Sequence, residues 1–65
     1  MLINYPVTST AIARLDYDDE AEICYLTFTD GRSYELPSIP QIEVERWAAS
    51  ASPGGYFNAN IRGTY

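Results

Sequence analysis

The side chains that most often carry out catalysis are missing from this sequence. It contains no histidine and no lysine, and its one cysteine, Cys24, lies within an alternating apolar stretch. A Ser-His-Asp or Cys-His arrangement therefore cannot form within one chain, and the usual amine nucleophile is absent as well. We therefore predict that the chain is not an enzyme and uses no cofactor, and that Cys24 is a small core residue.

Carboxylates are the next candidates for chemistry, because they are clustered. Five of the nine acidic residues fall within seven positions: Asp16, Asp18, Asp19, Glu20 and Glu22. An EF-hand calcium loop would need a glycine at its sixth position, which this segment lacks. We predict a solvated turn without a metal; a calcium loop and a contact with a basic partner are the alternatives.

Aromatic side chains, which are 14% of the chain, give a stronger indication of binding. Single-stranded bases stack on such rings, and Tyr25, Tyr34, Tyr56 and Arg62 would form a platform of this kind, with Asn58 bonding a ligand's edge. Four of these five binding candidates also have a structural alternative. Tyr34 and Tyr56 would pack in the core, Arg62 would pair with a nearby acid, and Asn58 would cap a helix.

Length and charge restrict the class of protein. Sixty-five residues make a single domain, 1–65, and a net charge of -5 disfavours non-specific binding of nucleic acid. The first 13 residues show no basic stretch and no long apolar run, as a signal peptide or membrane anchor would require. We therefore expect a cytoplasmic protein with no membrane contact.

The candidate residues lie on elements that the sequence pattern predicts. Residues 10–17 indicate a first strand, 23–29 alternate strictly and indicate a second, and 32–36 return as a third. Asp30-Gly31 between the last two is a favoured two-residue hairpin turn of type I′.

Helical spacing replaces this alternation after Pro40. Val44, Trp47, Ala48 and Ala51 form one apolar stripe of a helix that begins at Gln41. The segment 52–55 interrupts the spacing, and Phe57, Ile61 and Tyr65 then recur at helical intervals. This predicts a short terminal helix, capped by Ser52 or Asn58.

The predicted fold is α+β: a three-stranded antiparallel β-meander with one packed helix and a short C-terminal helical turn. One helix does not cover both faces of such a sheet. We therefore expect Tyr25, Thr27 and their neighbours of the same parity to face solvent, a partner or a second copy.

From about residue 7 to 65 the sequence matches the motifs of one family of short modules. The N-terminal part of the family pattern is matched by Val7, Ser9, Ile12, Leu15, Tyr17 and Asp18, and its strand and turns by Leu26, Phe28, Asp30, Gly31, Ile39 and Pro40. The central Tyr-x-Tyr is half present, because Leu36 follows Tyr34. The closing signature is matched by Ser52, Gly54, Tyr56, Phe57, Asn58, Ile61, Arg62 and Tyr65. With these residues the sequence resembles the KTSC domain, which is found at the C-terminus of some lysyl-tRNA synthetases and alone in bacteria and phages. The resemblance implies membership of the family and suggests RNA binding.

These observations together predict a non-catalytic binding module. We expect it to act by protein–protein contact through the exposed sheet face and the C-terminal motif. As a phage or host accessory protein it would cap or inhibit a larger partner, or it would self-associate. The alternative is binding of RNA or a nucleotide through the tyrosines and Arg62.

Overall fold

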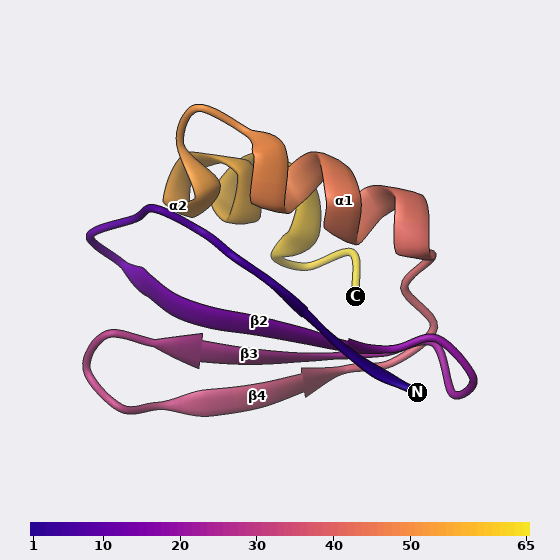
Figure 1. Ribbon diagram of the computed structural model, residues 1–65. Coiled ribbons are helices and arrows are strands. Elements are labelled where there is room, and N and C mark those ends of the chain that lie inside the picture. Colours follow the sequence, from indigo (N-terminus) through magenta and orange to yellow (C-terminus); the bar gives the residue numbers. More distant parts are fainter.

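Four antiparallel strands and three short helices make up the computed structural model, which describes residues 1–65. The strands are β1 (Leu2–Tyr5), β2 (Ile12–Asp18), β3 (Ile23–Phe28) and β4 (Ser33–Leu36), and they lie side by side in that order. The helices are α1 (Gln41–Ala49), α2 (Pro53–Tyr56) and η1 (Phe57–Ile61). All three helices lie over one face of the sheet, and the opposite face is uncovered (Figure 1).

The α+β class and the antiparallel meander are confirmed, but the predicted number of strands was too low. The additional strand is β1, which pairs with β2 from Leu2 opposite Asp18 to Tyr5 opposite Leu15. Its four residues are too few to show a convincing alternation, and no turn dipeptide introduces it. β1 therefore becomes a strand through its pairing with β2, whose partner residues lie 10 to 16 positions further along the chain.

The hairpin between β3 and β4 has a different loop from the predicted one. Phe28 N–H donates to the Arg32 carbonyl at 2.8 Å, so the loop contains three residues rather than two. Gly31 has a positive φ of 95° while Asp30 has not, as in a type I turn followed by a left-handed glycine. The Asp30 carboxylate accepts from the Arg32 backbone N–H at 3.1 Å and closes the turn.

The core lies between the sheet and α1, on the face predicted by the alternation. Its buried apolar side chains come from every layer: Ile12, Leu15, Tyr17, Cys24, Leu26, Leu36, Ile39, Val44, Trp47 and Ile61. The polar atoms of the two buried rings, Trp47 and Tyr17, are hydrogen-bonded. Trp47 Nε1 donates to the Pro53 carbonyl at 3.0 Å, and Tyr17 Oη donates to the Ile39 carbonyl at 2.7 Å. Burying these rings therefore leaves no polar atom without a hydrogen bond.

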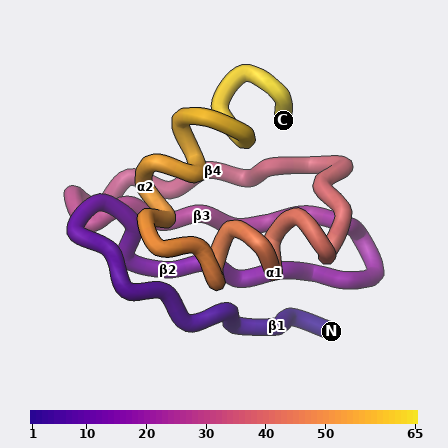
Figure 2. Tube along the Cα trace, turned by 90° about the horizontal axis from the view of Figure 1, so that it is seen from above, coloured from indigo at the N-terminus to yellow at the C-terminus, as the bar shows by residue number.

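Two successive helical turns follow α1 and bring the chain back over the sheet. Ser52, not Asn58, caps the first of them, because its Oγ accepts from the Gly55 N–H at 3.2 Å. In the second, the Arg62 N–H bonds the Phe57 carbonyl five residues back at 2.8 Å, which gives η1 its wide π-helical turn. Viewed from above, this C-terminal segment crosses β4 and ends beyond it, away from β3 (Figure 2).

The uncovered face of the sheet is polar, and its groups largely bond each other. Asp16 is only 9% exposed there and accepts hydrogen bonds from Asn4 Nδ2 at 3.0 Å and Arg14 Nε at 2.5 Å. Thr27 and Ser33 share a hydroxyl contact of 3.4 Å on neighbouring strands. This face has few side-chain groups that lack a partner.

Candidate functional site

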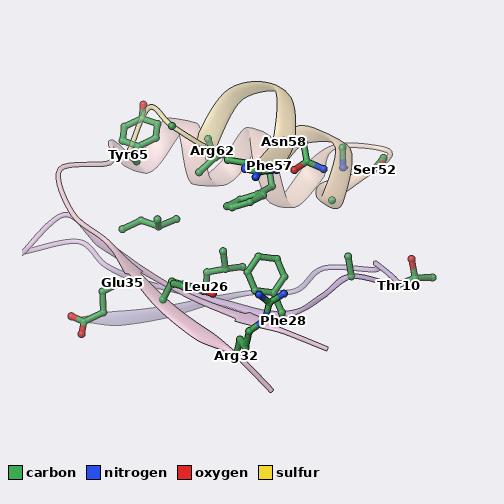
Figure 3. A pocket seen from close by; sticks show the side chains of 17 residues that line it. Thr10, Leu26, Phe28, Arg32, Glu35, Ser52, Phe57, Asn58, Arg62 and Tyr65 are labelled. Carbon is green, nitrogen blue, oxygen red and sulfur yellow. Dashed lines mark hydrogen bonds between the residues drawn. The ribbon is translucent and has the colours of Figure 1, made fainter. Parts of the chain in front are cut away.

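A groove of about 850 Å³ opens between β3 and β4 on one side and α2 and η1 on the other. Leu26, Phe28 and Arg32 form its lower wall, and Phe57 and Arg62 its upper wall (Figure 3). Thr10 and Ser52 lie at one end, and Tyr65 lies at the other. Because this is the largest hollow of a small protein and contains both rings and charges, it is the candidate binding site.

Connected aromatic rings make up much of the wall of this groove. The Phe28 ring meets Tyr34 edge-on with centroids 5.7 Å apart and Phe57 edge-on at 5.5 Å. Phe57 in turn stacks on the buried Trp47 at 5.8 Å. Tyr34 is at the mouth of the groove and remains 46% exposed. The rings thus form a rigid apolar surface that is anchored in the core and partly open to a ligand.

Two arginines line the groove, and they differ in how they are held. Arg32 Nε donates to Asp30 Oδ2 at 2.8 Å, and its guanidinium lies 5.5 Å from the centre of the Phe28 ring. The hydrogen bond that Arg32 donates to Asp30 raises the pKa of Arg32 and keeps it charged. Arg62 is exposed, forms no ion pair and makes no side-chain hydrogen bond within the chain. The predicted pairing of Arg62 with a nearby acid is therefore wrong, and its guanidinium is free to bind an anion.

The uncharged polar groups of the groove include one free amide. Asn58 lines the groove and is exposed, and its side-chain amide makes no hydrogen bond within the chain, whereas Ser52 is occupied as a helix cap. Glu35 is the one acidic lining residue, and its carboxylate points away from the opening (Figure 3). Arg62 is thus the one cation of the groove that no acid neutralises, on a protein of net charge -5.

Of the five predicted binding residues, three meet in this groove and two lie elsewhere. Tyr34, Asn58 and Arg62 line it together. Tyr25 is opposite Asp16 and Glu35 in the sheet and lies on the uncovered face, as its parity predicts. Tyr56 Oη donates to Glu43 Oε2 at 2.5 Å, and this hydrogen bond raises the pKa of the Tyr56 phenol. Tyr56 thus fastens α2 to α1 and does not face the groove.

The acidic segment and the cysteine have structural roles. Asp18 accepts from the Glu20 and Ala21 N–H groups at 3.0 and 3.1 Å, and these backbone hydrogen bonds lower its pKa. The predicted solvated turn is confirmed for Asp19, Glu20 and Glu22, which are exposed. It is wrong for Asp16, which lies within β2 and is only 9% exposed because Asn4 and Arg14 bond its carboxylate. Cys24 is fully buried, and burial raises the pKa of its thiol to about 12.

The sheet, its one-sided cover of helices and the C-terminal groove define a class of small α+β domain. The KTSC domain family matches residues 8–65, so the chain belongs to this family. A crystal structure of the KTSC domain protein YPO2434 from Yersinia pestis has the same fold, with a TM-score of 0.88 and 22% sequence identity. The match covers 98% of this chain and 90% of that protein. No curated protein matches the sequence, and no helix here has the length and apolar character needed to cross a lipid bilayer.

The sequence prediction missed part of this site, although one signal for it was present. Phe28, Arg32, Ser52 and Tyr65 line the groove and were not among the predicted binding residues. The closing KTSC signature contained much of the missing information, because every one of its residues except Tyr56 lines the groove. Arg32 had no such signal, since its position depends on how the hairpin loop folds.

Proposed function

We propose that this KTSC domain is a non-catalytic binding module that holds a segment of a protein partner in its C-terminal groove. The observation that carries the proposal is Arg62, an exposed cation without an acidic partner inside a groove walled by aromatic rings. Such rings supply most of the binding energy of protein interfaces, and a free arginine adds a directed contact to a carboxylate. The partner would be a larger protein that this domain caps or inhibits.

The uncovered sheet face is the weaker candidate for this contact. Its central carboxylate already bonds Asn4 and Arg14, and Thr27 contacts Ser33. A partner on this face would have to replace these bonds without gaining a pocket for an anchoring side chain. The groove offers both a pocket and a free charge.

A nucleotide or nucleic acid is the second candidate ligand, supported by the meeting of Tyr34, Asn58 and Arg62 in one groove. A ring stacked on Tyr34 with its phosphate at Arg62 would use the same side chains. The net charge of -5 opposes the binding of a longer strand, because the surrounding acidic surface repels further phosphates.

Photo-crosslinking tests the proposal at single positions. A photoreactive phenylalanine analogue replaces Tyr34 at the groove in one variant and Tyr25 on the uncovered face in a matched control. We expect the Tyr34 variant to crosslink a protein in lysate of the native cell, and this band to disappear on addition of Arg62→Gln. Crosslinking from the Tyr25 position alone would instead assign the contact to the uncovered face.

A salt titration separates the two ligand classes. Single-stranded RNA and DNA are titrated at two salt concentrations with the wild type and with Arg62→Gln. Weak binding that does not depend on Arg62 is expected. Tight binding that falls with salt and needs Arg62 would favour the nucleic-acid function over the protein-binding one.

A further inference from the structure

The outer edge of β4 carries backbone groups that have no partner within the chain. Phe28 and Arg32 form a hydrogen-bonded pair, through the Phe28 N–H and the Arg32 carbonyl. Such pairs alternate along an antiparallel ladder, so Tyr34 and Leu36 also direct their backbone groups toward β3. Ser33 and Glu35 then direct theirs outward, and β4 has no further strand beside it. Two residues of this edge thus offer free N–H and C=O groups.

The groove extends along this same edge. Tyr34, Glu35 and Leu36 line it from β4, while Phe57 and Arg62 face them from η1. A fifth strand would lie ~4.8 Å beyond β4, and the C-terminal segment ends above that position (Figure 2). Alternate side chains of such a strand would point toward η1, and the groove would receive them.

We propose that the partner's segment binds as an added β-strand on β4, with an apolar or aromatic side chain in the groove and an acidic one at Arg62. This inference rests on the proposed function and specifies the chemistry of its ligand. Main-chain hydrogen bonds to Ser33 and Glu35 supply affinity that does not depend on the segment's sequence, and the groove selects the side chains.

Charge complementarity fixes the acidic residue of the segment. Arg62 is the unpaired cation of the groove, and Glu35 directs its carboxylate away from the opening. A carboxylate that approaches along β4 therefore meets a free guanidinium and no opposing acid within the groove. A basic segment would meet Arg62, which no acid neutralises, and be repelled.

The test uses a displayed library of random linear peptides selected against the intact domain. Enriched peptides are expected to combine an aromatic or large aliphatic residue with Asp or Glu at a fixed spacing. Arg62→Gln should weaken their binding about tenfold, since hydrogen bonds to charged groups are the stronger ones. Enriched peptides that are basic, or that bind Arg62→Gln equally well, would overturn the proposal.

Two measurements report on strand addition itself. Glu35→Pro removes an outward N–H, which β3 does not use, and should weaken binding about fivefold. In the unchanged protein, the amides of Ser33 and Glu35 should exchange rapidly with solvent when free and slowly when the peptide is bound. The exchange measurement stands even if the proline variant fails to fold.

These experiments distinguish a failure of strand addition on β4 from a failure of peptide binding in the groove. Peptides that need Tyr34 and Arg62 but leave the exchange of Ser33 and Glu35 unchanged would refute strand addition and support groove binding. Failure to enrich any peptide that contacts the groove would overturn both. Binding of single-stranded RNA, dependent on Arg62, in place of peptides would assign the groove to the other class of ligand.

Discussion

Arg32 and Arg62 show how one residue type takes two roles within a single groove. Arg32 follows the β-turn, bonds Asp30 at 2.8 Å and lies over the Phe28 ring. Arg62 follows η1, where its backbone N–H completes the wide turn and its side chain contacts no acid. The first arginine stabilises the wall of the groove, and the second is available to a ligand.

Cys24 is a second residue whose surroundings determine its behaviour, because its buried thiol stays protonated in the folded protein over a wide pH range. Burial raises its pKa from 9.0 to about 12. The neutral thiol therefore contributes its full share to the stability of the folded state below pH 9, and this share is lost as the pH rises toward 12. This group alone should lower the free energy of unfolding by about 1.4 kcal/mol per pH unit above its unfolded pKa.

Urea denaturation at several alkaline pH values measures this dependence, with Cys24→Ala as the matched control. All other groups are the same in both proteins, so the difference between the two profiles isolates the cysteine. Profiles that run parallel above pH 9 would show that the thiol is not held neutral by the fold.

β1 is the strand that the sequence pattern did not predict, and it changes the fold in two ways. It extends the meander to four strands and contributes Tyr5, whose Oη accepts from Gln41 Nε2 at 2.8 Å. This bond joins the first strand to the first helix across 36 residues of sequence. The N-terminal strand is therefore tied both to the sheet and to its helical cover.

A double-mutant cycle on Tyr5 and Gln41 tests this connection. Tyr5→Phe removes the acceptor and should lower the free energy of unfolding by about 1 kcal/mol, the usual net value of one hydrogen bond. Gln41→Ala should have a similar effect, and the double variant should lose less than the sum. Strictly additive losses in thermal or urea unfolding would mean that the two side chains do not interact.

At the scale of the whole molecule, the main feature is the asymmetry between the two faces of the sheet. Helices cover one face, and the other is polar, with most of its groups bonded to each other. Exposed large apolar side chains are scattered, at Met1, Leu2, Tyr34 and Ile42. Neither face offers the continuous apolar patch that an obligate dimer would need.

We therefore expect the isolated domain to be a monomer at micromolar concentration. Each copy carries a net charge of -5, and repulsion between copies adds to the lack of an apolar patch. Light scattering after size-exclusion chromatography should give a mass near 7.3 kDa. A dimer that a variant at Tyr25 dissociates would instead assign the uncovered face to self-association.

Elements that are set by neighbouring residues were predicted correctly, and features that depend on contacts between elements were not. Alternation over residues 23–29 predicted β3, and the spacing of Val44 and Trp47 predicted α1, because each pattern repeats within one element. The hairpin loop was predicted at the right place but with the wrong length. Loop length depends on which residues close the ladder, and neither Phe28 nor Arg32 marks that choice in the sequence.

The α+β class, the uncovered sheet face and the KTSC signature that lines the groove follow from the sequence without coordinates. Three other features depend on the folded chain: β1 joins the sheet, Tyr56 bonds Glu43, and Arg62 is unpaired beside the edge of β4. Periodicity is set by neighbouring residues within one element, so it can be read along the chain. Whether a charge finds a partner depends on distances between elements far apart in sequence, and only the folded chain fixes these.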